Sequence, residues 1–168
     1  MPESRSRSPD NQGSTHQMSA GPPTVVSIGE LLWDQFPDGP HLGGAPSNFA
    51  VHTALLGARS VLVSRVGQDE HGDRAIKILG ERGVDTAFLQ RDPDLATGLV
   101  KVDLSGNEPE YEILQHVAWD AIAWEDRLTQ LLNSAQAVCF GTLAQRSEIS
   151  GKTIQKVVGD AADSCLKV

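Results

Sequence analysis

The stretch Gly43-Gly44-Ala45-Pro46-Ser47-Asn48 is the most informative part of this chain, because it joins a double glycine to a predicted helix start. Adjacent glycines lack two Cβ atoms, so a polar ligand can approach the backbone closely. Pro46 has a preset φ and no N–H, which suits the first turn of a helix. Asn48 adds an amide that can both donate and accept hydrogen bonds. The stretch therefore predicts a seat for a small polar molecule.

A carboxylate lies shortly upstream. The segment Gly29-Glu30-Leu31-Leu32-Trp33-Asp34 is predicted to end the first strand, and ligands of open α/β sheets bind beyond the carboxyl ends of strands. Asp34 could accept two charge-assisted hydrogen bonds from hydroxyls. Alone, it could equally be a turn aspartate before residues 37–40, but the neighbouring glycine pair favours ligand binding. Trp33 is interpreted as a packing residue, with stacking on a sugar face as the alternative.

Apolar runs alternate with helical patterns along the chain. The predicted strands are 25–28, 61–66, 88–89 and 137–140, and the predicted helices are 48–56, 70–82, 125–132 and 147–158. This order predicts an α/β fold with a mostly parallel sheet and helices on both faces. A predicted hairpin, 97–104 with 110–115, is expected to cover something instead of joining this sheet. Residues 166–168 are expected to begin a further strand.

Composition bounds the function. The 168 residues carry a net charge of −8, which argues against nucleic-acid and anionic-membrane partners. No stretch approaches the roughly 18 apolar residues of a membrane span. Residues 1–24 are predicted to be a disordered tail, with Met18 as an alternative start, and 25–168 to be the folded part. Cys139 and Cys165 are interpreted as structural thiols in a reducing compartment. Together with the lack of a hydrophobic segment at the N-terminus, this predicts a cytoplasmic location.

Other patterns are weaker. In 67–72, Asp69 is interpreted as a helix cap. Residues 150–153 end like a P-loop, but the first glycine would fall on Arg146, and the pattern starts inside a predicted helix. The chain has no G-x-G-x-x-G, and no metal site is assigned because its histidines are scattered. Only His41 and His116 are expected near the pocket.

In this order the motifs resemble the amino-terminal half of the ribokinase/PfkB carbohydrate kinase family, nearest its fructokinase-like members. The resemblance covers roughly residues 25–165. Its matching segments are 29–34, 43–50, 56–58, 66–72, 81–86 and 97–98. It implies a ribokinase-like α/β sandwich with a small β lid, truncated before the nucleotide-binding half. The lid is assigned to about 31–42 and 97–116.

The resemblance also implies roles for residues. Those implied to bind substrate hydroxyls are Asp34, Gly43, Gly44 and Asn48, and those assigned to the lid are Thr97, Gln115 and His116. The family phosphorylates a sugar hydroxyl with ATP and Mg²⁺. Ribokinase carries a lysine at the position of Ala45, so a ketose such as fructose, or a related sugar acid, is favoured. A homodimer through the β lid is a further implication.

The family keeps its phosphate cradle and catalytic base in a carboxyl-terminal G-A-G-D motif, which does not occur here. Its magnesium-linked N-x-x-E motif is expected to be missing as well. No catalytic residue is therefore assigned, and the chain alone is expected to be an incomplete, inactive kinase. Two alternatives stay open: a non-catalytic sugar-binding or dimerisation module, and a nucleoside kinase of the same family.

Overall fold

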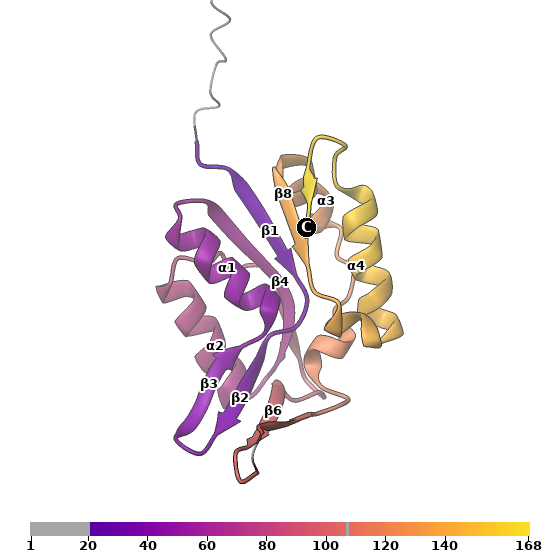
Figure 1. The fold of residues 1–168 in the computed structure, drawn as a ribbon. Coiled ribbons are helices and arrows are strands. Elements are labelled where there is room, and N and C mark those ends of the chain that lie inside the picture. The colour runs from indigo at the N-terminus through magenta and orange to yellow at the C-terminus, as the bar shows by residue number, and fades with distance from the viewer. Residues whose placement is uncertain (1–20, 107) are drawn as a thin grey trace, which may run out of the picture.

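The computed structural model describes residues 21–106 and 108–168 (Figure 1). Most of the predicted tail, with Met18, lies outside the described residues, and Thr24 already belongs to a strand. The strands are β1 (Thr24–Ile28), β2 (Leu32–Phe36), β3 (Gly39–Gly43), β4 (Arg59–Gly67), β5 (Leu89–Asp92), β6 (Gly98–Asp103), β7 (Glu110–Ile113), β8 (Ala137–Phe140) and β9 (Leu166–Lys167). The helices are α1 (Ala45–Leu55), α2 (Glu70–Glu81), α3 (Arg127–Ser134) and α4 (Glu148–Asp160), with 3₁₀ turns η1 (Ala118–Ala121) and η2 (Leu143–Arg146).

The central sheet has five parallel strands in the order β5-β4-β1-β8-β9. The chain first builds outward from β1 through β4 to β5, and then returns to the other side of β1 with β8 and β9. The strand order therefore reverses at β1, which is the position where open α/β sheets bind ligands, beyond the carboxyl ends of the strands.

Helices cover both faces of this sheet, as predicted (Figure 1). Val26, Ile28 and Val138 point toward the face covered by α3 and α4, and they form one apolar cluster with those helices. Leu62 and Val66 point to the opposite face and pack with residues of α1 and α2. A sheet that is buried on both sides needs apolar residues on both faces of each strand. Its strands are therefore continuous apolar runs.

The helix α1 lies close to the sheet because small hydroxyl residues face it. Ser27 of β1 donates to the Pro46 carbonyl at 2.7 Å, and Ser60 of β4 donates to the Ala50 carbonyl at 2.7 Å. Both serines are buried. Each satisfies its hydroxyl on the helix backbone, so close approach leaves no buried polar group unpaired. This contact fixes where the start of α1 lies relative to β1.

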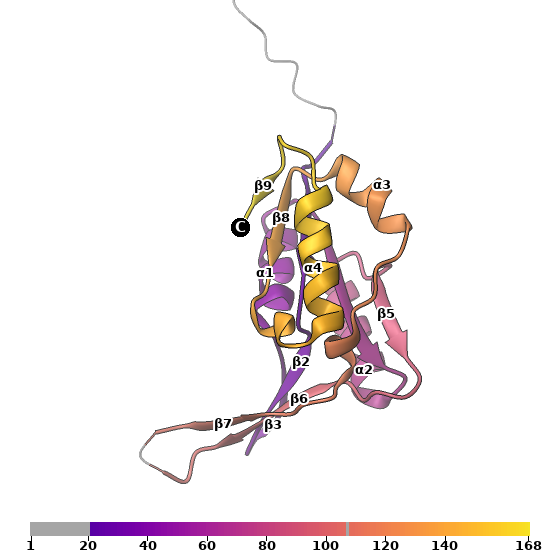
Figure 2. The same ribbon diagram turned by 90° about the vertical axis from the view of Figure 1, so that its right-hand side faces the viewer.

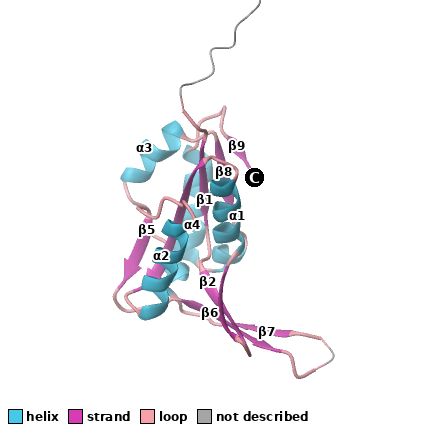
Figure 3. Cartoon of the chain, turned by 90° about the vertical axis from the view of Figure 1, so that its left-hand side faces the viewer, coloured by secondary structure: helices cyan, strands magenta, loops and turns pink. Residues whose placement is uncertain are grey.

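A second sheet, ordered β3-β2-β6-β7, extends from the carboxyl edge of the central sheet (Figures 2 and 3). The pair β6–β7 is antiparallel with Val100 opposite Ile113, so the predicted hairpin is correct and stays outside the central sheet. The predicted strand 25–28 corresponds to β1, but the interpretation of 29–34 as the end of this strand is wrong. The strand β1 ends at Ile28, the chain turns at Gly29, and Asp34 lies in the middle of β2.

Some element boundaries differ from the prediction. The helix α1 begins at Ala45 instead of Asn48, since Pro46 occupies its first turn. The strand predicted at 88–89 is β5 and runs from Leu89 to Asp92. The last residues form β9, parallel to β8, as expected. No helix among the described residues is long and apolar enough to cross a membrane.

Candidate functional site

Two glycines meet at the point where the strand order reverses. Gly29 follows β1, has φ of +149°, and lies so close to Gly141, which follows β8, that a Cβ on Gly29 would come within 3.3 Å of the Gly141 nitrogen. Bare backbone is therefore required here for the two strand ends to approach each other. The start of α1 packs on the same point, because Pro46 contacts both glycines.

Glu30 is a buried carboxylate behind the start of α1. It is only 4% exposed, and its Oε1 accepts a hydrogen bond from the Ala45 N–H at 3.3 Å. Its Oε2 has no hydrogen-bond partner among the described residues. Desolvation raises the pKa of Glu30, although nearby backbone N–H groups partly oppose the shift. Sequence reasoning missed this residue, and an acid directly after a buried strand was the available signal.

Asp34 and Gly43 lie in direct contact. They belong to β2 and β3, which pair antiparallel, and a Cβ on Gly43 would collide with the Asp34 carboxylate. A glycine is needed at position 44 for a different reason. The φ of Gly44 is +102°, and a Cβ there would come within 2.5 Å of the Glu30 carbonyl oxygen. The double glycine thus makes room for protein groups that shape the site, and not only for a ligand as the sequence suggested.

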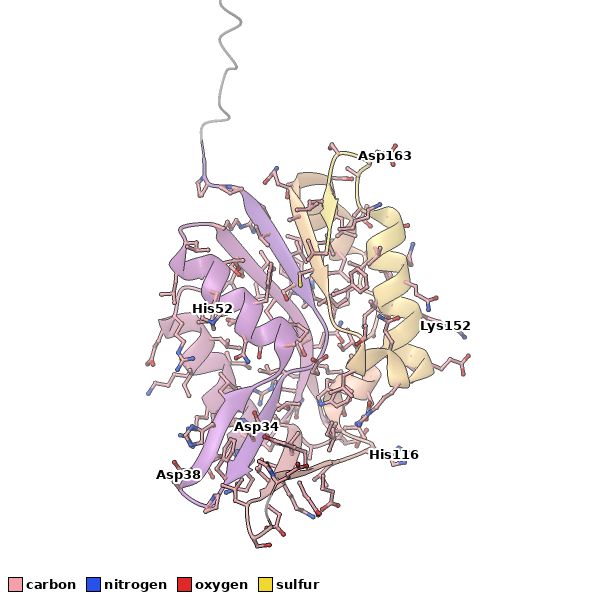
Figure 4. All side chains as sticks on the ribbon, viewed as in Figure 1. Asp34, Asp38, His52, His116, Lys152 and Asp163 are labelled. Carbon is pink, nitrogen blue, oxygen red and sulfur yellow. The ribbon has the colours of Figure 1, made fainter. Side chains whose placement is uncertain are left out.

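The Asp34 carboxylate is free to accept hydrogen bonds. It is half-buried, and no N–H or hydroxyl of the described residues donates to it. Burial raises the pKa of Asp34, and His41, its neighbour across the strand pair, partly opposes that shift. Figure 4 shows Asp34 at the root of the second sheet, near the edge of the central one. A carboxylate with open lone pairs suits hydroxyl groups.

Side chains along β2 alternate between the two faces of the second sheet, and this alternation determines which residues surround Asp34. Its neighbours Leu32 and Phe36 share its face and form an apolar cluster with two residues of β6, Val100 and Val102. The register of β6 and β7 places Tyr111 and Ile113 on this face as well, where Tyr111 is 59% exposed. Sequence reasoning missed these two residues, although their alternation with glutamates in 110–113 was a usable signal.

Trp33 points to the other face of the second sheet. It is 1% exposed, its Nε1 donates to the His71 carbonyl at 3.1 Å, and the Arg74 guanidinium lies 4.7 Å from its ring centroid. The ring therefore packs against α2 and faces away from Asp34. The packing interpretation of Trp33 is correct, and stacking on a sugar bound at Asp34 is not compatible with this position.

The remaining sequence-predicted residues lie at different places. Asn48 is exposed in the first turn of α1, and its N–H donates to the Gly44 carbonyl. Thr97 is buried at the start of β6, where its N–H and hydroxyl donate to Asp69 at 2.7 Å. Gln115 and His116 are exposed after β7, and His116 has φ of +56°. Figure 4 separates His116 from Asp34, so the structure does not bring these two together.

The sequence patterns given little weight have structural roles. Asp69 accepts from the Gly72 N–H at 2.8 Å and caps α2, as predicted. Gly151 and Lys152 lie inside α4, and Lys152 pairs with Glu148, so this segment forms no phosphate cradle. Cys139 and Cys165 are free thiols. Among residues 21–106 and 108–168, no cluster of three acidic, histidine or cysteine side chains could hold a metal ion.

The expectation that the chain contains no N-x-x-E pattern is wrong, because the sequence does contain one. The string occurs once, at 107–110; its first residue lies outside the described residues, and its last, Glu110, begins β7. Glu110 is exposed there, on a hairpin outside the central sheet. Among the described residues, no group of three acidic, histidine or cysteine side chains that could hold a metal ion lies around it, and no step of phosphoryl transfer is assigned to these residues.

A five-stranded parallel sheet with a four-stranded side sheet is the ribokinase-like architecture that this chain shares with solved sugar kinases. Residues 38–163 match the model of the pfkB family of carbohydrate kinases. The chain belongs to this family.

Relatives agree with this assignment. The chain is 33% identical over 153 residues to a sugar kinase of Pyrococcus horikoshii, PH1459, covering 84% of this chain and 49% of that protein. It is 30% identical to 2-dehydro-3-deoxygluconokinase of Thermoproteus tenax, covering 72% and 39%, and 31% identical to fructokinase-2 of Oryza sativa, covering 83% and 46%. The chain thus spans about half the length of the curated relatives it matches.

Solved structures also match over about half of their length. The crystal structure of the Pyrococcus horikoshii sugar kinase matches with a TM-score of 0.75 and 32% identity, over 86% of this chain and 51% of that one. The same protein in complex with ATP matches with a TM-score of 0.74. The fructokinase of Halothermothrix orenii matches with a TM-score of 0.74 and 25% identity, over 82% of this chain and 53% of that one.

Proposed function

We propose that this chain supplies the sugar-binding half of an ATP-dependent carbohydrate kinase, and that the sugar lies between Asp34 and the start of α1. The observation that carries the proposal is the Asp34 carboxylate, which is half-buried, accepts no hydrogen bond from the described residues and contacts Gly43. Asn48, exposed one turn into α1, is the proposed second contact to sugar hydroxyls. The second sheet serves as the lid of this site.

The preferred substrate is a neutral ketose such as fructose. Asp34 lies opposite the exposed His41 across the β2–β3 pair, and no side chain among the described residues donates a hydrogen bond to it. A sugar acid would bring a second carboxylate toward Asp34, and like charges in a half-buried site repel. The relatives include both a fructokinase and a 2-dehydro-3-deoxygluconokinase, so the two sugars are the natural comparison.

Phosphoryl transfer belongs to a complete kinase with ATP and Mg²⁺ bound. Positioning and charge stabilisation around the γ-phosphate dominate this chemistry. The described residues offer neither a phosphate cradle nor a cation cluster. We therefore propose that the 168 residues bind sugar without turning over ATP. A cytoplasmic location stays a prediction.

A second role is favoured by one observation. Leu104, Tyr111 and Ile113 are exposed large hydrophobic residues of the β6–β7 segment, 49%, 59% and 37% exposed. Two copies of this chain could cover them against each other, giving the lid-mediated dimer implied by the family resemblance. Sedimentation equilibrium of the chain and of a Tyr111→Ser variant tests this role: the chain should be dimeric and the variant monomeric.

Isothermal titration calorimetry tests the sugar proposal. Fructose, 2-dehydro-3-deoxygluconate and adenosine are each titrated into the chain and into the Asp34→Asn variant. Binding of fructose that is lost in the variant supports the proposal, and binding of adenosine alone supports the nucleoside kinase alternative. Absence of binding to all three contradicts the site. An ATP turnover assay with fructose should show no sugar phosphate.

A further inference from the structure

Arg146, which sequence analysis treated only as the residue that breaks a P-loop pattern, joins the central domain to the end of the second sheet. Its guanidinium pairs with both carboxylate oxygens of Asp120, each at 2.8 Å, and donates from Nη2 to the Leu114 carbonyl at 2.6 Å. Leu114 directly follows β7, whereas Arg146 ends η2, which follows β8 of the central sheet. One side chain therefore bridges the two sheets.

Trp119 extends this bridge to the other strand of the hairpin. The Arg146 guanidinium lies 3.9 Å from the centroid of its ring, and the ring edge lies against Gly98, the first residue of β6, where a Cβ would collide with it. Trp119 is fully buried, and its Nε1 has no partner among the described residues. The cluster Trp119–Asp120–Arg146 thus contacts the start of β6 and the end of β7 together.

The hairpin in turn determines where Asp34 lies. The strand β6 pairs with β2 in parallel register, with Val100 opposite Asp34. A second anchor holds the start of β6 from the α2 side, where Asp69 accepts from both the N–H and the hydroxyl of Thr97. The hairpin is therefore attached at two places, to Asp69 on one side and to the Arg146 cluster on the other.

We propose that Arg146 is a positioning residue: it fixes the β6–β7 hairpin, and through β2 the Asp34 carboxylate, relative to the start of α1. This proposal rests on the proposed sugar site for its functional meaning, but not for the anchoring itself. A planar guanidinium can bind a carboxylate with two parallel hydrogen bonds and still donate to a carbonyl while stacking on an indole. A lysine ammonium cannot reproduce this geometry.

Amide hydrogen exchange tests the anchoring. Arg146→Lys keeps the positive charge but removes the planar guanidinium and its paired hydrogen bonds. Asp120→Asn keeps the size of the side chain but removes the negative charge that pairs with Arg146. Lys152→Met is the matched control, since Lys152 makes an exposed ion pair on α4 far from the hairpin in sequence and without contact to it. We expect both test variants to exchange the amides of β6 and β7 about tenfold faster or more, a factor that matches the loss of one charged hydrogen bond.

The amides of β1 and β4 should keep wild-type protection in all three variants, and the control should leave β6 and β7 unchanged. Equal protection of β6 and β7 in wild type and both test variants overturns the proposal. Loss of protection to the same extent in β1, β4, β6 and β7 overturns it too, because Arg146 would then support overall stability only.

Fructose calorimetry on the same proteins separates this proposal from the sugar site. Weaker fructose binding in Arg146→Lys, with Lys152→Met like wild type, supports positioning of Asp34. If the wild-type chain binds no fructose, the proposed function fails, while the exchange data still decide whether Arg146 anchors the hairpin. Wild-type fructose affinity in Arg146→Lys, with a loosened hairpin, overturns the link to Asp34.

Discussion

Asp34 and Gly43 contact each other across the β2–β3 pair, and the carboxylate fills the space that a side chain at position 43 would need. Gly43 ends β3 and α1 begins two residues later at Ala45, so the Asp34 carboxylate contacts the segment that leads into this helix. The contact explains why a glycine is needed at position 43 and brings the Asp34 carboxylate beside the segment that leads into α1.

Gly43→Ala should therefore disable the site. Its Cβ would collide with the Asp34 carboxylate, so either the carboxylate turns away or the strand pair shifts. We expect fructose binding to be lost and the free energy of unfolding to fall. Gly80→Ala is the matched control, because Gly80 lies inside α2 with open space around it and should gain roughly 0.5–1 kcal/mol of stability. Calorimetry and urea unfolding measure both effects, and unchanged fructose affinity in Gly43→Ala would refute the contact.

The pH dependence of binding should report Asp34. Burial raises the pKa of this carboxyl, against the opposing effect of His41. Since the ionised form accepts the stronger hydrogen bonds, fructose affinity should fall as the pH drops through this raised pKa, starting above the ordinary value of about 3.9. Asp34→Asn should bind weakly and without this pH dependence. Wild-type affinity that stays constant between about pH 7 and about pH 4 contradicts the assignment.

The pH dependence of the free energy of unfolding should reflect the ionisation of Glu30. Burial raises the pKa of its carboxyl in the folded state, so the folded chain holds the proton more tightly than the unfolded chain. The stability contribution of the neutral form is complete below about pH 4.3, the ordinary glutamate value, and is lost as pH rises through the raised pKa. Glu30→Gln cannot ionise, so its stability relative to wild type should increase as pH rises. Urea unfolding over a pH series measures this, and parallel profiles would contradict it.

Much of the fold could be predicted from the sequence because its central strands are apolar runs and two of its helices, α1 and α2, end at glycines. Gly83 shows this, since its φ of +81° ends α2 where the pattern predicted. The course of 29–34 could not be predicted. An apolar run that continues past Gly29 looks like one strand, and only the pairing of β2 with β3 and β6 shows that the chain has changed sheets.

The candidate site was predictable in part for the same reason. Asp34 and the glycines stand out by residue type, but their contact depends on strand register. Glu30 and Arg146 were missed because their roles depend on burial and on partners distant in sequence: Arg146 meets Leu114 and Asp120 only after the chain has folded back. No local spacing encodes such contacts, so they need the tertiary structure.

The central claim is that a sugar hydroxyl is held by Asp34 beside the double glycine. The most direct measurement is a fructose titration followed by ¹⁵N–¹H NMR. The amide signals of Gly43 and Gly44 should shift with rising fructose, those of Gly80 and Gly159 should stay in place, and Asp34→Asn should abolish the shifts. Signals of Gly43 and Gly44 that do not move in the wild-type chain at saturating sugar would contradict the claim.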